Sequence, residues 1–334
     1  MVTIYDVAKA AGVSVATVSR VFAGNSHVSA GRKEAVEEAA KELGFVPNSM
    51  ARRLRTQHSE VIALLVPDIE NPFFTLIARA VEDVARERGY SVMLCNTDED
   101  PERESEYLRV AASEPVAGII IVPTSSVDLS LPLERGVPVV SVDRHAGSFD
   151  VDAVVADNAE SSKRAAELLF DHGYSRVACI TGPMGVETAD ERLRGWAEAV
   201  RERTGSEPKA ELAKRASYSL EGGEEATREL LALPSPPDAI FAANNRLGAG
   251  ALRALHEVDS LPPKVGVVSF GGLPLILLAP LGVLITHLPA RELGKRAAEM
   301  LLERIDGLDI PARSEVLEVQ VGGEDSGIEL MYGQ

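Results

Sequence analysis

Apolar positions follow two different patterns along this chain of 334 residues. In the first 45 residues they recur every three or four positions, which predicts three short helices ending near Ala11, Phe22 and Leu43. From residue 60 onward, short runs of consecutive apolar residues alternate with longer stretches of helical spacing. Such runs are typical of parallel strands buried on both faces, so the pattern predicts an all-α segment followed by an α/β segment.

The α/β segment contains more strands than one sheet holds comfortably. The predicted strands are 61–66, 90–95, 116–122, 137–142, 176–181, 239–244 and 265–270. The predicted helices are 73–88, 103–113, 159–172, 190–203, 222–232, 246–257 and 290–305. We therefore expect two doubly wound parallel-sheet subdomains. Ligands in such folds bind beyond the carboxyl ends of the strands, so two facing subdomains would place these ends around one cleft.

The three predicted helices of the first segment carry start and stop signals. Thr3 is a candidate N-cap, with Asp6 reaching back to it. Ser14 and Ser29 are candidate N-caps of the second and third helices, and Gly44 suits the end of the third. These signals predict where the helices begin and end.

The spacing of Ala8, Gly12 and Val18 is that of a helix-turn-helix, in which Gly12 turns the chain and Val18 packs between the helices. The exposed face of the second helix carries short residues and one arginine. These residues are Val15, Ala16, Thr17, Ser19 and Arg20. Short side chains let a helix enter the major groove, where apolar groups meet thymine methyls and arginine pairs with guanine. DNA binding is therefore expected, and a purely structural helical bundle is the alternative.

The charge is distributed unevenly. The whole chain has a formal net charge of −17, but residues 1–60 contain eight lysines and arginines against six acids. An acidic remainder repels polyanions, so only the first segment is expected to meet nucleic acid. The segment 46–59 has three arginines, no acid and an apolar Leu54. This composition predicts a short helix that is only marginally stable by itself and that folds when the segment binds DNA. The alternative is a solvated linker.

Other features argue for a cytoplasmic protein without catalytic chemistry. Cys95 and Cys179 lie in apolar runs, so we expect them to be core residues. Two cysteines are too few for a disulfide framework, which fits a reducing compartment. The first residues lack the apolar run of a signal peptide, and no apolar run spans a bilayer. No nucleotide-binding loop, nucleophile elbow or His/Cys cluster is found. The acidic run 98–104 reads as a solvated loop leading into a helix rather than a metal site, so no cofactor or metal is expected.

The stretches "TIYDVAKAAGVSVATVSRVF", "HVS" and "GFVPNSMARRLR" resemble the start of the lactose-repressor/galactose-repressor (LacI/GalR) family of bacterial transcription regulators. The resemblance implies that Val15, Ala16 and Arg20 read bases. It assigns contacts with the DNA backbone to Tyr5, Ser14, Thr17, Ser19, His27 and Ser29. It also places Leu54 as a wedge in the minor groove beside Ala51, with Arg52 and its neighbouring arginines at phosphates or groove edges.

The remainder of the chain resembles the same family, which uses the periplasmic sugar-binding fold. The resemblance implies a helix-turn-helix domain over 1–45 and a hinge over 46–59. It implies an N-terminal subdomain of 60–156 with 288–315, and a C-terminal one of 157–287 with 316–330. A regulator that binds a palindromic operator as a homodimer and is controlled by a small molecule in the interdomain cleft is expected, and the resemblance favours a repressor. The final "GGEDSGIELMYGQ" has no apolar heptad, so no tetramerising tail is expected.

The same resemblance assigns the effector-binding residues. They are Phe73, Phe74, Asp143, Arg144, Arg192, Tyr218, Asn244 and Gly271. Core packing is the alternative for the three aromatic residues, and a surface salt bridge is the alternative for Arg192. A solute-binding protein of the periplasmic type and an enzyme on the same scaffold are the competing functions.

Two positions depart from the family pattern. Asn245 stands where the family usually has an acid, and "FGGLP" replaces an acidic pair with Gly271 and Gly272. With Arg144 and Arg192 retained and only Asp143 as a counter-charge, the site is expected to favour an anionic effector. The alternative is that effector control has weakened or been lost.

Overall fold

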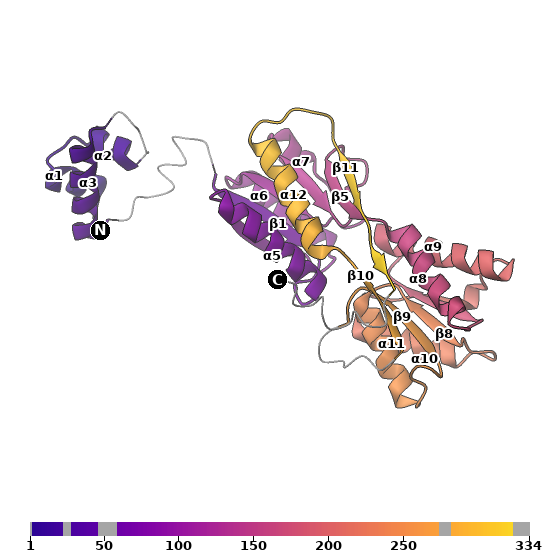
Figure 1. The fold of residues 1–334 in the computed structure, drawn as a ribbon. Helices are drawn as coiled ribbons and strands as arrows, with labels where there is room; N and C mark the ends of the chain where they lie inside the picture. The colour runs from indigo at the N-terminus through magenta and orange to yellow at the C-terminus, as the bar shows by residue number, and fades with distance from the viewer. Residues whose placement is uncertain (1, 23–27, 46–58, 274–281, 323–334) are drawn as a thin grey trace. The chain divides into compact units, whose positions relative to one another are not determined.

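The computed structural model describes residues 2–22, 28–45, 59–273 and 282–322, which form two compact units (Figure 1). The first unit, Met1–Ser59, is called the headpiece below, and the second, Glu60–Gln334, the body. His27 and the hinge residues 46–58 lie outside the described residues, so the roles predicted for Ala51, Arg52 and Leu54 stay predictions.

The described residues of the headpiece form three helices around one small apolar core. They are α1 (Ile4–Ala10), α2 (Val15–Phe22) and α3 (Ala30–Leu43). Val7, Val18 and Val36, one from each helix, are fully buried together. Gly12 and Gly44 have φ angles of +64° and +62°, which lets the chain turn sharply after α1 and after α3. The predicted helix-turn-helix geometry is therefore present.

The helix starts follow the predicted caps with one exception. The Asp6 carboxylate accepts hydrogen bonds from the Thr3 N–H at 2.8 Å and the Thr3 hydroxyl at 2.7 Å. The Ser14 Oγ accepts the Thr17 N–H at 3.1 Å. Ser29 occupies the N-cap position of α3, but its side chain makes no capping hydrogen bond. The prediction that the Ser29 hydroxyl caps α3 is wrong, because only the Ser29 carbonyl accepts bonds from the first turn.

The described part of the body forms two six-stranded sheets. The first has the order β11-β5-β4-β3-β1-β2, with β1 (Val61–Val66), β2 (Ser91–Asn96), β3 (Gly118–Ile121), β4 (Val139–Val142), β5 (Asp152–Ala156) and β11 (Ser314–Leu317). The second has the order β12-β10-β9-β8-β6-β7, with β6 (Val177–Thr181), β7 (Ala213–Arg215), β8 (Ala239–Ala242), β9 (Gly266–Phe270), β10 (Val283–His287) and β12 (Gln320–Val321). Every described strand pair is parallel except β10 with β12.

Helices cover both faces of the sheets. They are α5 (Pro72–Glu87), α6 (Pro101–Ser113), α7 (Ser130–Glu134), α8 (Asn158–Asp171), α9 (Glu187–Thr204), α10 (Leu220–Leu231), α11 (Asn245–Glu257) and α12 (Ala290–Ile305). Along β1, Ile62 and Leu64 pack under α5 and α12, while Ala63 and Leu65 pack on the opposite face under α6. This two-sided burial explains why the central strands are continuous apolar runs.

The predicted fold class is confirmed, with an all-α headpiece and two doubly wound α/β sheets. All seven predicted strands and all seven predicted body helices occur within three residues of their expected bounds. Strands β5, β7, β10, β11 and β12 were not predicted. Strands β7 and β12 have three and two residues, and β10 and β11 are partly exposed, whereas β5 is a fully buried, mostly apolar run that its pattern could have predicted. In the described parts of the chain, no helix has the length and apolar character needed to cross a bilayer.

Asp152 joins the returning segment of the chain to the first sheet. Its side chain on β5 is fully buried and accepts hydrogen bonds from Arg304 of α12 at 2.8 and 2.9 Å. It also accepts bonds from the Arg313 side chain at 2.9 Å and the Arg313 N–H at 2.8 Å, just before β11. Burial opposes its charge, but these arginine bonds lower the pKa of Asp152 to about 2.

We expect Asp152→Asn to destabilise the body by about 2 kcal/mol at neutral pH, since a pKa depressed by nearly two units stores that much free energy. The contribution is fully present above the unfolded carboxyl pKa near 4 and is lost as the pH falls through about 2. Urea unfolding followed by circular dichroism between pH 7 and pH 2 measures it. Asp309→Asn, at an exposed position nearby, is the control. Equal losses in both variants would contradict the role given to Asp152.

Candidate functional site

The second helix of the headpiece presents the predicted base-reading residues at the surface. Ala16 and Arg20 are exposed and Val15 is partly exposed, whereas Val18 and Val21 are buried against the other two helices. The other described DNA-contact candidates are also at least partly exposed: Tyr5, Ser14, Thr17, Ser19 and Ser29. Helix α2 therefore has an apolar face inside its own unit and an outer face of small residues and one arginine.

Four of the predicted effector residues form one polar cluster in the body. Asp143 and Arg144 follow β4, Arg192 lies on α9, and Tyr218 lies between β7 and α10. Asp143 and Tyr218 each interact electrostatically with both arginines. The cluster therefore gathers side chains from both sheets at the carboxyl ends of the strands, where a doubly wound fold places its ligands.

Asp143 is the most constrained member of the cluster. It is 3% exposed and has a φ angle of +69°, a region that non-glycine residues rarely adopt. Its Oδ1 is shielded from solvent and has no hydrogen-bond partner among the described residues, and its Oδ2 lies 3.7 Å from the Arg144 Nε. Burial raises the pKa of Asp143, while the two arginines oppose that rise. A strained, buried carboxylate with an unused oxygen is typical of a ligand-binding position.

Arg192 is held inside the body. Its Nε donates to the Asn158 Oδ1 and its Nη1 donates to the Ala243 carbonyl, both at 2.8 Å. Its guanidinium also lies over the Phe270 ring, 4.4 Å from the centroid. Burial lowers the pKa of Arg192. The alternative of a surface salt bridge is wrong, because Arg192 is 5% exposed and pairs with no acid in the described ranges.

Tyr218 packs against the backbone after β6. A Cβ added to Gly182 would lie 2.3 Å from the Tyr218 Cζ, so the ring occupies the space that a side chain at 182 would need. Burial raises the pKa of Tyr218. Its hydroxyl is shielded and makes no hydrogen bond of normal geometry within the described chain, although it lies close enough to interact with the Thr188 side chain. The hydroxyl is thus a second unused polar group of the cluster.

The aromatic pair at the start of α5 divides between two environments. Phe74 is 7% exposed and belongs to the core beneath α5, whereas Phe73 is only partly buried. The two rings pack edge to face, with centroids 5.0 Å apart. The core-packing alternative therefore describes Phe74, and only Phe73 retains a partly accessible face.

Asn244 and Gly271, both predicted to bind the effector, make hydrogen bonds that stabilise the body itself. The Asn244 Oδ1 accepts the Leu247 N–H at 2.8 Å and caps α11, so this oxygen serves the helix. The Gly271 N–H donates to the Thr286 Oγ1 at 2.9 Å, and its φ angle is +101°. Both residues lie at the strand ends, beside Asn245, whose Nδ2 donates to the Asn71 Oδ1 at 3.0 Å.

An acid that the sequence analysis missed changes the electrostatics of the cluster. Glu99 accepts from the Arg144 Nη1 at 2.8 Å and Nη2 at 2.6 Å, a bidentate pair. Asp143 is therefore not the only counter-charge, and that expectation is wrong. The reading of 98–104 as wholly solvated is also wrong, because Glu104 is buried and accepts the Thr124 N–H and hydroxyl at 2.7 Å. No metal-binding group of acids, histidines or cysteines occurs among residues the structure describes.

Further contacts join loops of the two sheets around the cluster. The His145 N–H and Nδ1 each lie 2.6 Å from a Glu187 carboxylate oxygen, and the His145 Nε2 lies 3.0 Å from the Ser314 Oγ. Arg246 at the start of α11 pairs with Asp68 after β1. Residue spacing gave no signal for these contacts, because the partners are between 42 and 178 positions apart.

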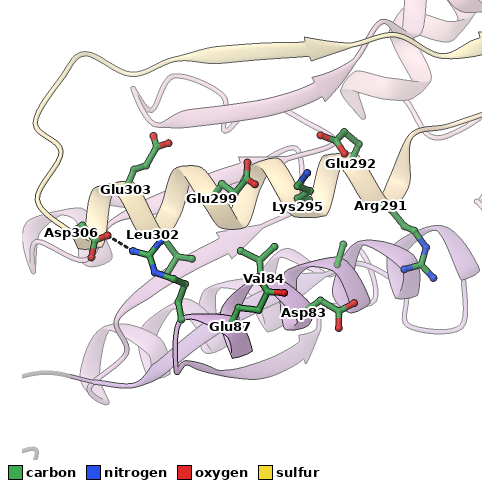
Figure 2. A pocket seen from close by; sticks show the side chains of 12 residues that line it. Asp83, Val84, Glu87, Arg291, Glu292, Lys295, Glu299, Leu302, Glu303 and Asp306 are labelled. Atoms are coloured by element: carbon green, nitrogen blue, oxygen red, sulfur yellow. Dashed lines mark hydrogen bonds and ion pairs between the residues drawn. The ribbon is translucent and has the colours of Figure 1, made fainter. Parts of the chain in front are cut away.

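A groove of about 550 Å³ lies elsewhere on the body, between α5 and α12 (Figure 2). Figure 2 shows carboxylates along both helices, among them Asp83, Glu87, Glu303 and Asp306, and the last pairs with Arg88 at 2.5 Å. None of the predicted effector residues lines this groove. It is therefore separate from the polar cluster.

Comparison with known proteins gives matches over both units. Residues 3–48 match the family model "Bacterial regulatory proteins, lacI family", and residues 59–321 match "Periplasmic binding proteins and sugar binding domain of LacI family". A ribose operon repressor of Halalkalibacterium halodurans is 37% identical, covering 98% of this chain and 99% of its own. The ribose operon repressor of Escherichia coli K12 is 32% identical, covering 91% and 93%. A lac repressor dimer bound to operator and the anti-inducer ONPF has a TM-score of 0.83 at 26% identity, covering 96% and 98%.

The backbone conformation after β9 disfavours an acid at Gly271, where the family usually has one. We expect Gly271→Asp to destabilise the body by about 1–3 kcal/mol, since a side chain at a φ of +101° is strained. Its Cβ would also lie 3.4 Å from the Leu288 Cδ1. Gly272→Asp is the matched control, because its Cβ meets nothing within 4 Å and its φ is ordinary. Urea unfolding of both variants tests this, and equal stability would contradict the strain at Gly271.

Proposed function

This chain belongs to the LacI family of bacterial regulatory proteins, and we propose that it is a sugar-controlled repressor that binds a palindromic operator as a homodimer. Membership in a family of regulators decides against an enzyme. The headpiece match argues against a periplasmic solute-binding protein, which has no use for a helix-turn-helix. Since its target would be chromosomal DNA, the protein would act in the cytoplasm.

The outer face of α2 carries the DNA-binding part of the proposal. Ala16 and Arg20 are exposed on a helix whose opposite face is buried, so the helix can enter a major groove without disturbing its core. Two copies related by a two-fold axis would read half-sites about one helical turn apart. Leu54 in the hinge would wedge the minor groove between them, as the family resemblance implies.

The unused polar atoms of the cluster support a small polyhydroxylated effector. Asp143 offers a buried acceptor and Tyr218 a buried hydroxyl, and each would leave an unpaired group at a cost of about 1–3 kcal/mol unless a ligand or water met it. By resemblance to the family, we assign the partly buried Phe73 as an apolar ring of the same site, since ligand pockets are lined largely by apolar and aromatic side chains. The repressors named above take their names from ribose, which supports a pentose or a related sugar.

Charge balance favours a neutral sugar over the anionic effector expected above. Glu99 occupies both Nη atoms of Arg144, and Asp143 lies beside the same guanidinium. Arg192 has two of its three nitrogens bonded to neutral oxygens. With two carboxylates facing two guanidiniums, the cluster has no excess positive charge to attract an anion.

We expect Arg20→Ala to weaken specific operator binding by about 1–3 kcal/mol and to relax the preference at one base position in each half-site. The site is first selected from random DNA with the unmodified protein and then used in competition titrations. Arg32→Ala removes the same charge from an exposed position on α3 and should lower all DNA affinities uniformly. Equal affinity of the unmodified protein for every sequence would overturn the proposed operator binding.

We expect Asp143→Asn to weaken binding of a neutral sugar at least about tenfold, because a charged acceptor becomes a neutral one. Asparagine tolerates the positive φ angle, so the loop should keep its shape. Isothermal titration calorimetry with D-ribose and other neutral pentoses and hexoses measures this, and Asp150→Asn, at an exposed position, is the control. The sugar-control proposal is abandoned if the unmodified protein binds no neutral sugar.

A further inference from the structure

Arg144 is a buried cation whose bidentate face is already taken. The residue is 4% exposed, and its Nη1 and Nη2 point at the two oxygens of Glu99 at 2.8 and 2.6 Å. The Nη1 also donates to the Pro123 carbonyl at 3.2 Å. A planar guanidinium holds phosphate or carboxylate ligands through the same pair of nitrogens. An anionic ligand would therefore have to compete with an internal carboxylate.

The loop that carries Glu99 is built to hold it in this position. Asp98 and Glu99 have φ angles of +54° and +56°, an unfavourable conformation for two consecutive non-glycine residues. The Asp98 carboxylate accepts from the Asn96 Nδ2 at 2.5 Å and pairs with Arg103 on α6. The next residue, Asp100, caps α6 by accepting the Glu102 N–H at 2.8 Å. Anchors on both sides thus compensate the strained backbone that turns Glu99 inward.

We propose that Glu99 is a specificity-determining residue that occupies the anion-binding face of Arg144, so that the effector site accepts uncharged ligands and rejects anionic ones. This proposal rests on the effector site proposed above, and it explains why that site would bind uncharged ligands. Glu99 acts through Arg144 as a positioning residue. It also fixes the guanidinium plane, which leaves the Nε directed near Asp143 and away from bulk solvent.

Removing the carboxylate should reverse the preference. Without Glu99, Arg144 would be a buried cation whose nearest remaining acid is Asp143, at 3.7 Å. A second guanidinium, that of Arg192, acts on the same carboxylate. Two guanidiniums facing one acid form a site in which an incoming phosphate gains charge-assisted hydrogen bonds. A purely structural ion pair between Glu99 and Arg144 would change stability without changing which ligands bind.

The test compares Glu99→Gln with Glu102→Gln, which removes the same charge from an exposed side chain three residues away. The probes are D-ribose, D-ribose 5-phosphate and inorganic phosphate, titrated calorimetrically into the full chain. Glu99→Gln is expected to bind both phosphates at least about tenfold more tightly than the unmodified protein. Glu102→Gln is expected to leave all affinities unchanged. Adding Arg144→Gln to Glu99→Gln should abolish the gain.

The outcomes separate the two proposals. If Glu99→Gln folds, as judged by circular dichroism, and gains no affinity for either phosphate, the role of Glu99 is overturned, whatever D-ribose does. The glutamine side chain could still accept a hydrogen bond from Arg144, whereas the alanine of Glu99→Ala cannot. If Glu99→Ala also gains no affinity for either phosphate, the role of Glu99 is overturned without that ambiguity. If the unmodified protein binds no sugar, the proposed sugar control fails, and the inorganic phosphate titrations still decide whether Glu99 blocks Arg144.

Discussion

The parallel direction of the strands is the constraint on which the body depends. Most of the parallel connections in the body run through a helix, so both faces of the central strands are largely apolar and most charged side chains lie outside the strands. The loops that follow β2, β4, β8 and β9 therefore carry the acids, amides and glycines that could bind a ligand. The polar cluster lies at the ends of the strands because helices cover both faces of the central strands, and a charge inside a sheet needs partners such as those that Asp152 finds in Arg304 and Arg313.

Charge compensation then decides what the cluster can do. A buried guanidinium is costly unless an acid or carbonyl meets it, and Arg144 and Arg192 solve this problem differently. Arg144 has a bidentate carboxylate, whereas Arg192 has two neutral oxygens and an aromatic ring. The carboxylate neutralises the charge of Arg144, whereas the neutral oxygens and the ring stabilise Arg192 without neutralising it. A count of acids and bases in the predicted site could not distinguish these arrangements.

Most of the fold could be predicted, because burial on two faces leaves a strong mark on the sequence. The run 61–66 became β1 with the bounds expected, whereas β11 alternates between exposed and half-buried residues and was missed. Within the candidate site, Asp143, Arg144, Arg192 and Tyr218 do meet. The Glu99–Arg144 pair was not foreseen, since its members are 45 positions apart and Glu99 lies in an acidic run that reads as solvated. Tertiary placement, not local pattern, decides which acid of such a run turns inward.

The Asp152 cluster has a consequence for synthesis of the chain. The Asp152 carboxylate can form its ion pair with Arg304 only after the ribosome has added 152 more residues. At about 5–20 residues per second on a ribosome, that interval is on the order of ten seconds or more. Strands β6 to β10 emerge in between, and α12 reaches α5 only afterwards. The first sheet therefore begins to emerge first but receives its last strand, β11, only after β6 to β10 of the second sheet, and during that delay the apolar surface of α5 that α12 will cover remains exposed.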